Sequence, residues 1–467
     1  MSIRQSKFAK DLTQGPLLSQ VLLFSLPIML TSVLQLLFNT ADRIVVGRWG
    51  GATPDECESA LAAVGSCGSL IHLFVNVFIG LSVGAGICAA HRIGAKDYEG
   101  VKKVVQTVVP LASLIGTGVM IVGMAAAGPM LSLMNTDPRI LDAATMYMIA
   151  YFAGTPANMV YVFCAALLRS DGDTVHPLIF LSSAGIVNVF LNLLMVLVFH
   201  LGAVGVGIAT AVSQWVACVL ILWYMKKTDG VCHLDFRQMH MEKSVVKEII
   251  RVGLPAGIQS SLFSLSNILI QSSINSFGKT VVAGNTAAGS IEEYVYMCVN
   301  SLYHTAMTFV SQCRGARQYR RMYKAAWTCL LTGVLFGLVF GVSAAVFGRH
   351  LLAVFLPDND AAAQSGMIRL YCLCCFEALC GLQEIAGGIL RGMGRPLLPM
   401  VTTLIGTCLF RVLWILIVFR VVPELQIVYM SYPISWTLTA SAHFVSIWIT
   451  SRKFRREEQG LQTADTE

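Results

Sequence analysis

Twelve long apolar runs dominate this sequence, and they constrain its fold more than any other feature. Each run is close to the roughly 20 residues that an α-helix needs to cross a hydrocarbon layer about 30 Å thick. With 55% hydrophobic and only 13% charged residues, the chain is far more apolar than a soluble domain, in which about a quarter of residues are charged. An integral membrane protein is predicted, with runs near residues 17–47, 60–90, 104–127, 140–168, 177–199, 203–225, 252–277, 281–310, 326–347, 363–390, 397–419 and 426–450.

The continuity of these runs favours helices over strands. A membrane β-barrel would show short segments of alternating hydrophobicity, and helices are the other structure that satisfies the backbone in lipid. The predicted fold is therefore all-α, with twelve transmembrane helices and no soluble domain between them. Leu17–Gly47 lacks a small-residue cleavage site after a short apolar core, so we expect a retained first helix and not a signal peptide.

The distribution of lysine and arginine predicts the orientation. If the N-terminus is cytoplasmic, the inside segments hold 25 of the 33 Lys and Arg residues and the outside loops hold five. Because such residues accumulate on the cytoplasmic side, both termini are expected in the cytoplasm. The net charge of +7 then requires no nucleic-acid partner. The basic tail at 452–456 has two open interpretations, contact with anionic lipid or an ordinary topology signal.

The fourteen cysteines predict neither disulfides nor a metal site. Most of them lie inside apolar runs, where cysteine acts as a small hydrophobic residue. The cluster of Cys372, Cys374 and Cys375 and the spacing from Cys232 to His240 both lack the paired spacing of a zinc site. No resident metal or other cofactor is expected.

Short motifs recur along the chain at offsets of 221 to 228 residues, which indicates two homologous halves. Since each half has six runs, the halves share one topology and should be related by an axis along the membrane normal, with a central cleft where they meet. The matched motifs are Leu26-Pro27 with Leu254-Pro255, Gly94-Ala95-Lys96 with Gly315-Ala316-Arg317, and Leu168-Arg169 with Leu390-Arg391. The predicted divisions are an N-terminal lobe at 1–225, a cytoplasmic linker at 226–247, a C-terminal lobe at 248–450 and a cytoplasmic tail at 451–467.

A polar stripe ends the first run. Thr31, Gln35, Asn39 and Asp42 are spaced four, four and three residues apart, which places them on one face of a helix. A carboxylate at such a depth costs about 2.5–3.5 kcal/mol on insertion scales, so Asp42 needs either a function or a structural partner. Arg43 points about 100° away from Asp42 on a helix, and we expect it to reach the outer surface.

Two further runs carry polar side chains with oxygen atoms. Asn188 and Asn192 are one helical turn apart, and Thr210 follows a run of small residues. Amide, hydroxyl and carboxylate oxygens suit a hard cation such as sodium better than a transition metal. The two asparagines have an alternative interpretation, hydrogen bonding between helices.

Together these motifs resemble the multidrug and toxic compound extrusion (MATE) family over nearly the whole chain. The resemblance implies twelve helices in two six-helix lobes around a cleft, in a multi-pass protein of the inner (plasma) membrane. It also implies export of cationic amphipathic compounds, driven by inward sodium ions or protons, and we expect a monomer in the bilayer. The motifs that carry it are Pro27, Asp42 with Gly47, Gly94-Ala95-Lys96, Leu168-Arg169-Ser170-Asp171-Gly172, Gln312-Cys313-Arg314-Gly315-Ala316 and Leu390-Arg391-Gly392-Met393-Gly394.

The resemblance also implies a coupling site. Positions matching Asp42, Asn188, Asn192 and Thr210 form an inner cation or proton site in the family. This sequence departs at Asn192, where the family commonly has a second aspartate. A site with one formal charge should hold sodium more weakly, so the coupling ion, Na⁺ or H⁺, stays open.

The second half has no acid at the position of Asp42, which the offset maps to Ile270. Coupling is therefore expected chiefly in the first half. Glu292, on one face with Tyr296, resembles a family position where an acid is frequent, and it is a further candidate for coupling or for attracting cations. Glu377 and Glu384 share a helix face, and two interpretations are open for them and Arg411: a structural ion pair, which is favoured, or a functional group.

The seventh run is unusually polar and suits the wall of a wet cleft. The candidate substrate residues combine this run with neighbouring positions: Gln35, Asn39, Gln259, Phe263, Asn267, Gln271 and Tyr296. Gly333, Gly337 and Gly341 in the ninth run instead predict close helix packing. Pro27 is a candidate hinge, because it removes a hydrogen bond to the carbonyl of Leu23.

Two other function classes remain as alternatives. A flippase for a lipid-linked saccharide, on a related fold, would need several cationic residues to hold pyrophosphate, and mid-span the sequence offers mainly Arg411 and Arg369. An intramembrane enzyme would need a nucleophile and a base at matched depth, whereas His72, His304 and His443 are isolated in apolar runs. No enzymatic activity is expected.

Overall fold

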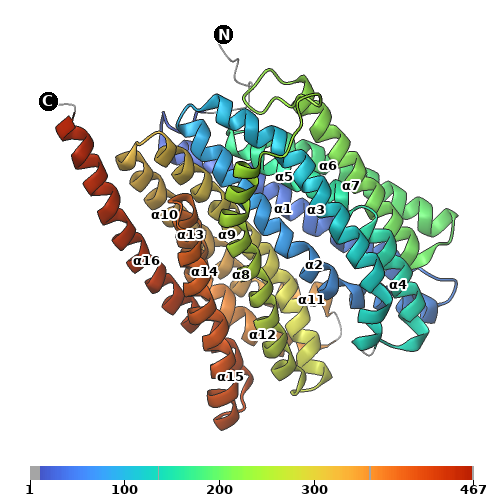
Figure 1. Ribbon diagram of the computed structural model, residues 1–467. Helices are drawn as coiled ribbons and strands as arrows, with labels where there is room; N and C mark the ends of the chain where they lie inside the picture. Colours follow the sequence, from blue (N-terminus) through green and yellow to red (C-terminus); the bar gives the residue numbers. More distant parts are fainter. Residues whose placement is uncertain (1–10, 135, 357–358, 465–467) are drawn as a thin grey trace. The chain divides into compact units, whose positions relative to one another are not determined.

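The computed structural model describes residues 11–134, 136–356 and 359–464, and over these ranges it is helical without a single strand (Figure 1). Arg4, Lys7, Lys10 and the last three residues of the predicted tail lie outside the described residues. The chain folds into two compact units. Unit 1 contains Leu30–Ile93 and Asp97–Gly257, and unit 2 contains Leu12–Met29, Gly94–Lys96 and Ile258–Glu467.

Unit 1 is built from long helices whose ends follow the sequence signals. Asp97 and Asp137 cap the helices that follow them by accepting backbone hydrogen bonds from Gly100 and Arg139. A π-helical segment, η1, extends the sixth helix. The elements are α1 (Leu17–Trp49, from Leu30), α2 (Pro54–Gly94), α3 (Tyr98–Leu133), α4 (Pro138–Phe152), α5 (Thr155–Ser170), α6 (Val175–Leu193), η1 (Leu194–Val198), α7 (Gly202–Lys227) and the first part of α8 (Lys243–Asn275).

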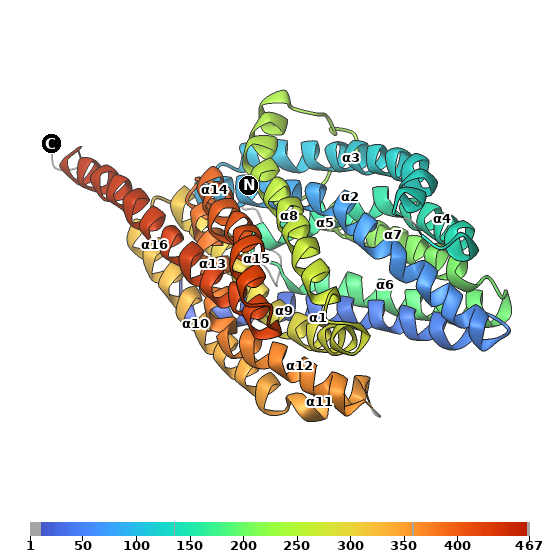
Figure 2. The ribbon, with the colours of Figure 1, turned by 90° about the horizontal axis from the view of Figure 1, so that it is seen from below.

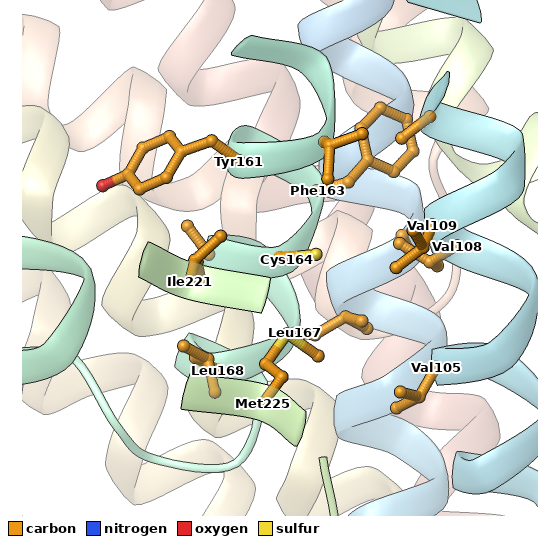
Figure 3. Close-up of a cluster of buried hydrophobic side chains, with 14 of the residues drawn as sticks. Val105, Val108, Val109, Tyr161, Phe163, Cys164, Leu167, Leu168, Ile221 and Met225 are labelled. Carbon is orange, nitrogen blue, oxygen red and sulfur yellow. The ribbon is translucent and has the colours of Figure 1, made fainter. Parts of the chain in front are cut away.

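The core of unit 1 lies where α3, α5 and α7 pack side by side (Figure 2). Val105, Phe163, Leu167 and Ile221 are completely buried there and belong to one apolar cluster (Figure 3). Burial of such side chains contributes about 1.5–3 kcal/mol each. This cluster forms a rigid support for the helices that carry the polar residues of unit 1.

The segment predicted as a linker, residues 226–247, is part of unit 1. Cys232 and Leu234 are fully buried members of its core. The backbone N–H of Glu242 donates to the Thr107 hydroxyl at 3.2 Å. The segment is therefore held by apolar and polar contacts along its length.

Unit 2 repeats the arrangement with more broken helices. Its core places α9 against α10 and α13, and α16 lies beside α13 (Figure 2). The elements are the remainder of α8, α9 (Lys279–Gly315), α10 (Tyr319–Val346), α11 (Gly348–Phe355), α12 (Asp360–Leu373), the 3₁₀ turn η2 (Cys374–Phe376), α13 (Glu377–Gly392), α14 (Leu397–Thr403), the π segment η3 (Leu404–Leu409), α15 (Phe410–Val421) and α16 (Leu425–Ala464).

The matched motifs adopt matched turns. Lys96 and Arg317, the third residues of the repeated Gly-Ala-basic motif, have positive φ values of 57° and 55°. Positive φ is uncommon for residues other than glycine, so its occurrence at both positions shows a conformation shared by the two motifs. Gly172 and Gly394 likewise both have positive φ, 93° and 74°.

Glycine stripes bring helices close together in each unit. A Cβ on Gly337 would lie 2.7 Å from the Cα of Ala378, which confirms the packing predicted for the stripe in α10. In unit 1, a Cβ on Gly84 would lie 2.8 Å from the Cα of Gly253, so α2 and α8 touch through their backbones. This second contact was not predicted from the sequence.

Eight helical stretches among the described residues are long and apolar enough to cross a membrane, and α4 with α5, bent by 44°, makes a ninth. Helices α8, α9 and α16 are 33, 37 and 40 residues long. They are long enough to span but fall outside this set. Helix α8 contains the seventh apolar run, and the polar side chains of that run lower its mean hydropathy.

Candidate functional site

The four predicted coupling residues come together in unit 1. Asp42 lies on α1, Asn188 and Asn192 lie one turn apart on α6, and Thr210 lies on α7. Asn192 is completely buried and Asn188 is 5% exposed. The structure thus brings residues as far as 168 positions apart into one polar cluster.

Hydrogen bonds connect the members of this cluster. The Asn192 Nδ2 group donates to Asp42 Oδ1 and, at 3.2 Å, to Asn188 Oδ1. Asn188 Nδ2 in turn donates to the Thr210 hydroxyl at 3.4 Å, and Thr210 lies beside Asp42 as well. The carboxylate of Asp42 is therefore compensated by neutral hydrogen-bond donors and has no cationic partner on α6 or α7.

Local sequence explains how α1 approaches α6 at this point. Gly185 lies on α6, and a Cβ there would overlap the ring of Phe38, one turn before Asp42 on α1. The absence of a side chain at Gly185 lets Phe38 lie directly against α6, which places Asp42 beside Asn192. The π segment η1 begins two residues after Asn192, and such segments are frequent at functional sites.

One buried oxygen atom of the cluster accepts no hydrogen bond from the described residues. That atom is Oδ1 of Asn192. A buried acceptor without a donor costs about 1–3 kcal/mol, and a cation or a proton carried by Asp42 would remove that cost. The chemistry of the donor set, one carboxylate with amide and hydroxyl oxygens, fits a hard cation.

Two tyrosines near the cluster were not predicted. Tyr147 and Tyr151 on α4 lie within electrostatic range of Asp42. They are four residues apart and so share a helix face. This spacing is the sequence pattern from which they could have been predicted to lie together. The side chain of Arg43 is exposed.

The position that matches Asp42 in unit 2 is apolar. Ile270 is 1% exposed and packs in a cluster with Ile415, Tyr429 and Trp436. At the offset of 222 residues, Asn188 matches Phe410, Asn192 matches Trp414 and Thr210 matches Tyr432. Unit 2 therefore has aromatic rings at the positions where unit 1 has oxygen donors.

Glu292 forms a closed ion pair in unit 2. Arg369 contacts Glu292 Oε2 through Nε and Nη2, both at 2.8 Å, and its Nη1 donates to Asn285 Oδ1 at 2.6 Å. The Tyr429 hydroxyl donates to the same Asn285 oxygen at 2.9 Å, and Asn285 Nδ2 donates to Gln271 at 3.1 Å. The Glu292 carboxylate is thus neutralised by Arg369, a partner that the sequence analysis did not name.

The ion pair predicted between Arg411 and the acids of α13 is absent, and that prediction was wrong. Both carboxylate oxygens of Glu377 and both terminal nitrogens of Arg411 lack hydrogen-bond partners. Glu377 faces α10, where its Cβ lies against Gly341, whereas Arg411 Nε donates to Ser435 of α16 at 2.9 Å. Gln383 donates to Glu384 at 3.5 Å. Helix spacing placed the two acids on one face but could not show which neighbour that face meets.

The predicted substrate residues occupy varied environments within their own units. In unit 1, Gln35 and Asn39 are exposed on α1. In unit 2, Gln259 accepts a hydrogen bond from Arg391 at 2.7 Å, and Asn267 Oδ1 is buried without a partner. The remaining three have these contacts: Phe263 with Arg411, Gln271 with Asn285 and Asn275, and Tyr296 with Asn300.

Comparisons with known proteins agree with this architecture. A family model described as MatE matches residues 27–194 and again 255–417, so its two matches begin at the matched prolines. The chain is 29% identical over 403 residues to the probable multidrug resistance protein YpnP of Bacillus subtilis, covering 86% of this chain and 88% of that protein. It is 24% identical over 400 residues to the probable multidrug resistance protein NorM of Thermotoga maritima, covering 83% and 82%.

Solved structures share the fold. A crystal structure of a MATE protein in the bent conformation superposes with a TM-score of 0.88 at 20% identity, covering 97% of this chain and 99% of that chain. An outward-facing multidrug resistance MATE transporter of the MOP superfamily gives a TM-score of 0.88 at 21% identity, covering 97% and 100%.

Proposed function

This chain belongs to the MatE family, and from that premise we propose that it exports cationic amphipathic drugs or toxic compounds in exchange for inward sodium ions or protons. The relatives named as multidrug resistance proteins support this function. The observation that carries it is the cluster of Asp42 with Asn192, Asn188 and Thr210 in unit 1. A single carboxylate held by neutral groups can bind and release one cation per cycle.

Asp42 is the proposed coupling residue. In the structure its carboxylate accepts a hydrogen bond from the Asn192 amide. A sodium ion would need oxygen atoms facing it, so Asn192 would have to turn its free Oδ1 toward the ion. A proton on Asp42 would instead convert the carboxyl into a donor toward the same oxygen. Either event changes how α1 is held against α6 and thereby biases the transporter between its states.

The test is reconstitution in liposomes with sodium and proton gradients imposed separately. Wild-type protein is expected to drive ethidium transport with one of the two gradients, and Asp42→Asn is expected to lose that dependence. Arg43→Gln, at the adjacent exposed position, is the matched control and should keep it. An Asp42→Asn protein that drives gradient-dependent transport at the wild-type rate would overturn the assignment.

Pro27 is the proposed hinge of α1. It lies inside the helix, and α1 passes from unit 2 to unit 1 after Met29, two residues beyond it. Pro255 occupies the same place in α8, which passes from unit 1 to unit 2 after Gly257. Normal ethidium turnover by Pro27→Ala would show that bending at this residue is dispensable.

The proposed topology has twelve spans, made by adding α8, α9 and α16 to the nine apolar stretches, with both termini in the cytoplasm of a cell whose plasma membrane holds the protein. The proposed lobes are residues 1–225 and 248–450. The topology is tested by introducing single cysteines at Lys279 and Lys243 and labelling them from each side of the membrane. Only Lys279→Cys should react with an impermeant reagent added outside.

A flippase for lipid-linked saccharides is not favoured. Such a substrate needs several cationic groups to hold its pyrophosphate, and Arg369 is engaged by Glu292. Transport of ethidium without any movement of labelled lipid separates the two functions.

A further inference from the structure

Arg411 is the largest fully buried side chain among the described residues, and it forms no ion pair with any of them. Its exposed fraction is 0%, it lies on α15 directly after the π segment η3, and arginine stays protonated in proteins. Its Nε donates to the Ser435 hydroxyl, a neutral group, whereas Nη1 and Nη2 have no acceptor in the part of the chain that the structure describes. Such an arrangement leaves a permanent cation with two unsatisfied donor groups inside a membrane-spanning helix.

Three aromatic rings surround the guanidinium group. Its central carbon lies 4.0 Å from the ring centroid of Tyr432, 5.3 Å from that of Phe263 and 6.0 Å from that of Trp436. We call these three rings the aromatic cage. Ring faces attract a cation, but they accept no conventional N–H hydrogen bond from the terminal nitrogens, so the cage stabilises the charge while leaving those donors unused.

No acid of the surrounding helices takes up these donors. Glu292 is held by Arg369 at 2.8 Å. Glu377 faces α10 and Glu384 accepts from Gln383. Nη1 and Nη2 thus donate to none of the described residues, and two parallel donors on a planar fork match the two oxygens of a carboxylate.

Resting on the proposed export function, we propose that Arg411 and the aromatic cage bind the carboxylate of substrates that carry an acid and a planar ring system in addition to an amine. The two terminal nitrogens would donate to the carboxylate, and the rings would stack on the substrate. Tyr432 and Phe263 are themselves partly exposed, so the surface of unit 2 reaches two of the rings that cover the guanidinium group. Displacement of those rings opens Arg411 to a ligand.

The matched position in unit 1 sharpens the assignment. Val189 stands there, and unit 1 has at Thr210 a hydroxyl where the cage has Tyr432. At this matched position the guanidinium group is therefore a feature of unit 2 alone.

The test compares norfloxacin with its methyl ester, which keeps the rings and the amine but loses the carboxylate. Binding to the full chain in lipid nanodiscs is measured by calorimetry. Wild-type protein is expected to bind the acid at least about tenfold more tightly than the ester, from the usual strength of hydrogen bonds to charged groups. Arg411→Met should abolish this preference, Arg411→Lys should keep part of it, and Arg420→Met, an exposed position at the end of the same helix, should keep all of it.

Several results would overturn the proposal. One is that wild type binds norfloxacin and its methyl ester with equal affinity, or binds neither. Another is that Arg411→Met keeps the wild-type preference for the acid over the ester. Equal loss of both ligands in Arg411→Met and Arg411→Lys would assign Arg411 to packing alone. Ethidium transport by wild type is measured in parallel, because ethidium has no carboxylate. If wild type shows no preference for the acid but still transports ethidium, only the role of Arg411 is contradicted. If wild type does not transport ethidium, the proposed export function is contradicted.

Discussion

The two units hold their ionisable groups in opposite ways. In unit 1 the carboxylate of Asp42 is held by neutral amides and a hydroxyl, with one spare oxygen on Asn192. In unit 2 the corresponding acid is replaced by Ile270, and the ion pair of Glu292 with Arg369 is closed by hydrogen bonds. A charged group that must bind and release an ion needs its charge to be only partly compensated. A charged group that stabilises the fold needs its charge to be fully compensated.

The largest expected effect comes from breaking the closed pair of unit 2. Arg369→Met leaves Glu292, whose side chain is only 15% exposed, without its partner, and the loss of one member of a buried pair costs up to about 3–5 kcal/mol. The free energy of unfolding, measured by denaturant titration in detergent, should fall by that order. The double variant Arg369→Met with Glu292→Met should recover much of the loss, because no unpaired charge remains. Equal destabilisation by the single and double variants would contradict the ion-pair account.

The turn after α5 provides the next contrast. Burial raises the pKa of Asp171 from 3.8 to about 7, with the charge of Asp173 as a second cause, while the matched residue of unit 2 is Met393. Because the folded protein binds this proton more tightly than the unfolded chain, stability falls as pH rises from about 4 to 7. Each pKa unit corresponds to about 1.4 kcal/mol, so the total is a few kcal/mol at most.

Asp171→Asn should remove that dependence. Melting temperatures of wild type and variant, recorded from pH 4 to 8, are expected to diverge as pH increases, with the variant more stable at neutral pH. Glu58→Gln, at an exposed site, is the control and should run parallel to wild type. A constant difference across the range would show that Asp171 does not titrate there.

The glycine contacts test whether the two units share a packing rule. Gly253→Ala in unit 1 and Gly337→Ala in unit 2 each place a Cβ 2.7 Å from a neighbouring Cα. Overpacking of this kind costs about 1–3 kcal/mol, and the two losses of unfolding free energy should be similar. Gly118→Ala in α3, where a Cβ meets nothing within 4 Å, should instead gain up to about 1 kcal/mol.

The smallest expected effect sharpens the ion site. Asn192→Asp adds a second carboxylate beside Asp42 and should strengthen sodium binding by about tenfold, or about 1.4 kcal/mol, because hard cations prefer charged oxygens. Sodium-dependent quenching of tryptophan fluorescence measures it. Asn300→Asp, in unit 2, is the matched control. A variant that binds sodium no better than wild type would indicate that Asn192 does not face the ion.

Sequence reasoning predicted those parts of the site that depend on periodicity. The spacing of Asn188 and Asn192 placed them on one helix face, and the structure confirms that they hydrogen-bond each other. The predicted ion pair with Arg411 was wrong, because the spacing of Glu377 and Glu384 shows which helix face they share but not what that face contacts. Sequence reasoning missed the Glu292–Arg369 pair because 77 residues separate the partners.

The sequence by itself determined that this chain is a helical membrane protein built from a repeated motif with one unmatched aspartate. Hydrophobicity and helical periodicity are properties of neighbouring residues, so they can be read without coordinates. Only the tertiary structure decided that Asn192 is the partner of Asp42, that Arg369 neutralises Glu292 and that Arg411 lies in the aromatic cage. Those contacts depend on which helix faces meet, and that is set by side-chain packing between segments far apart in the chain.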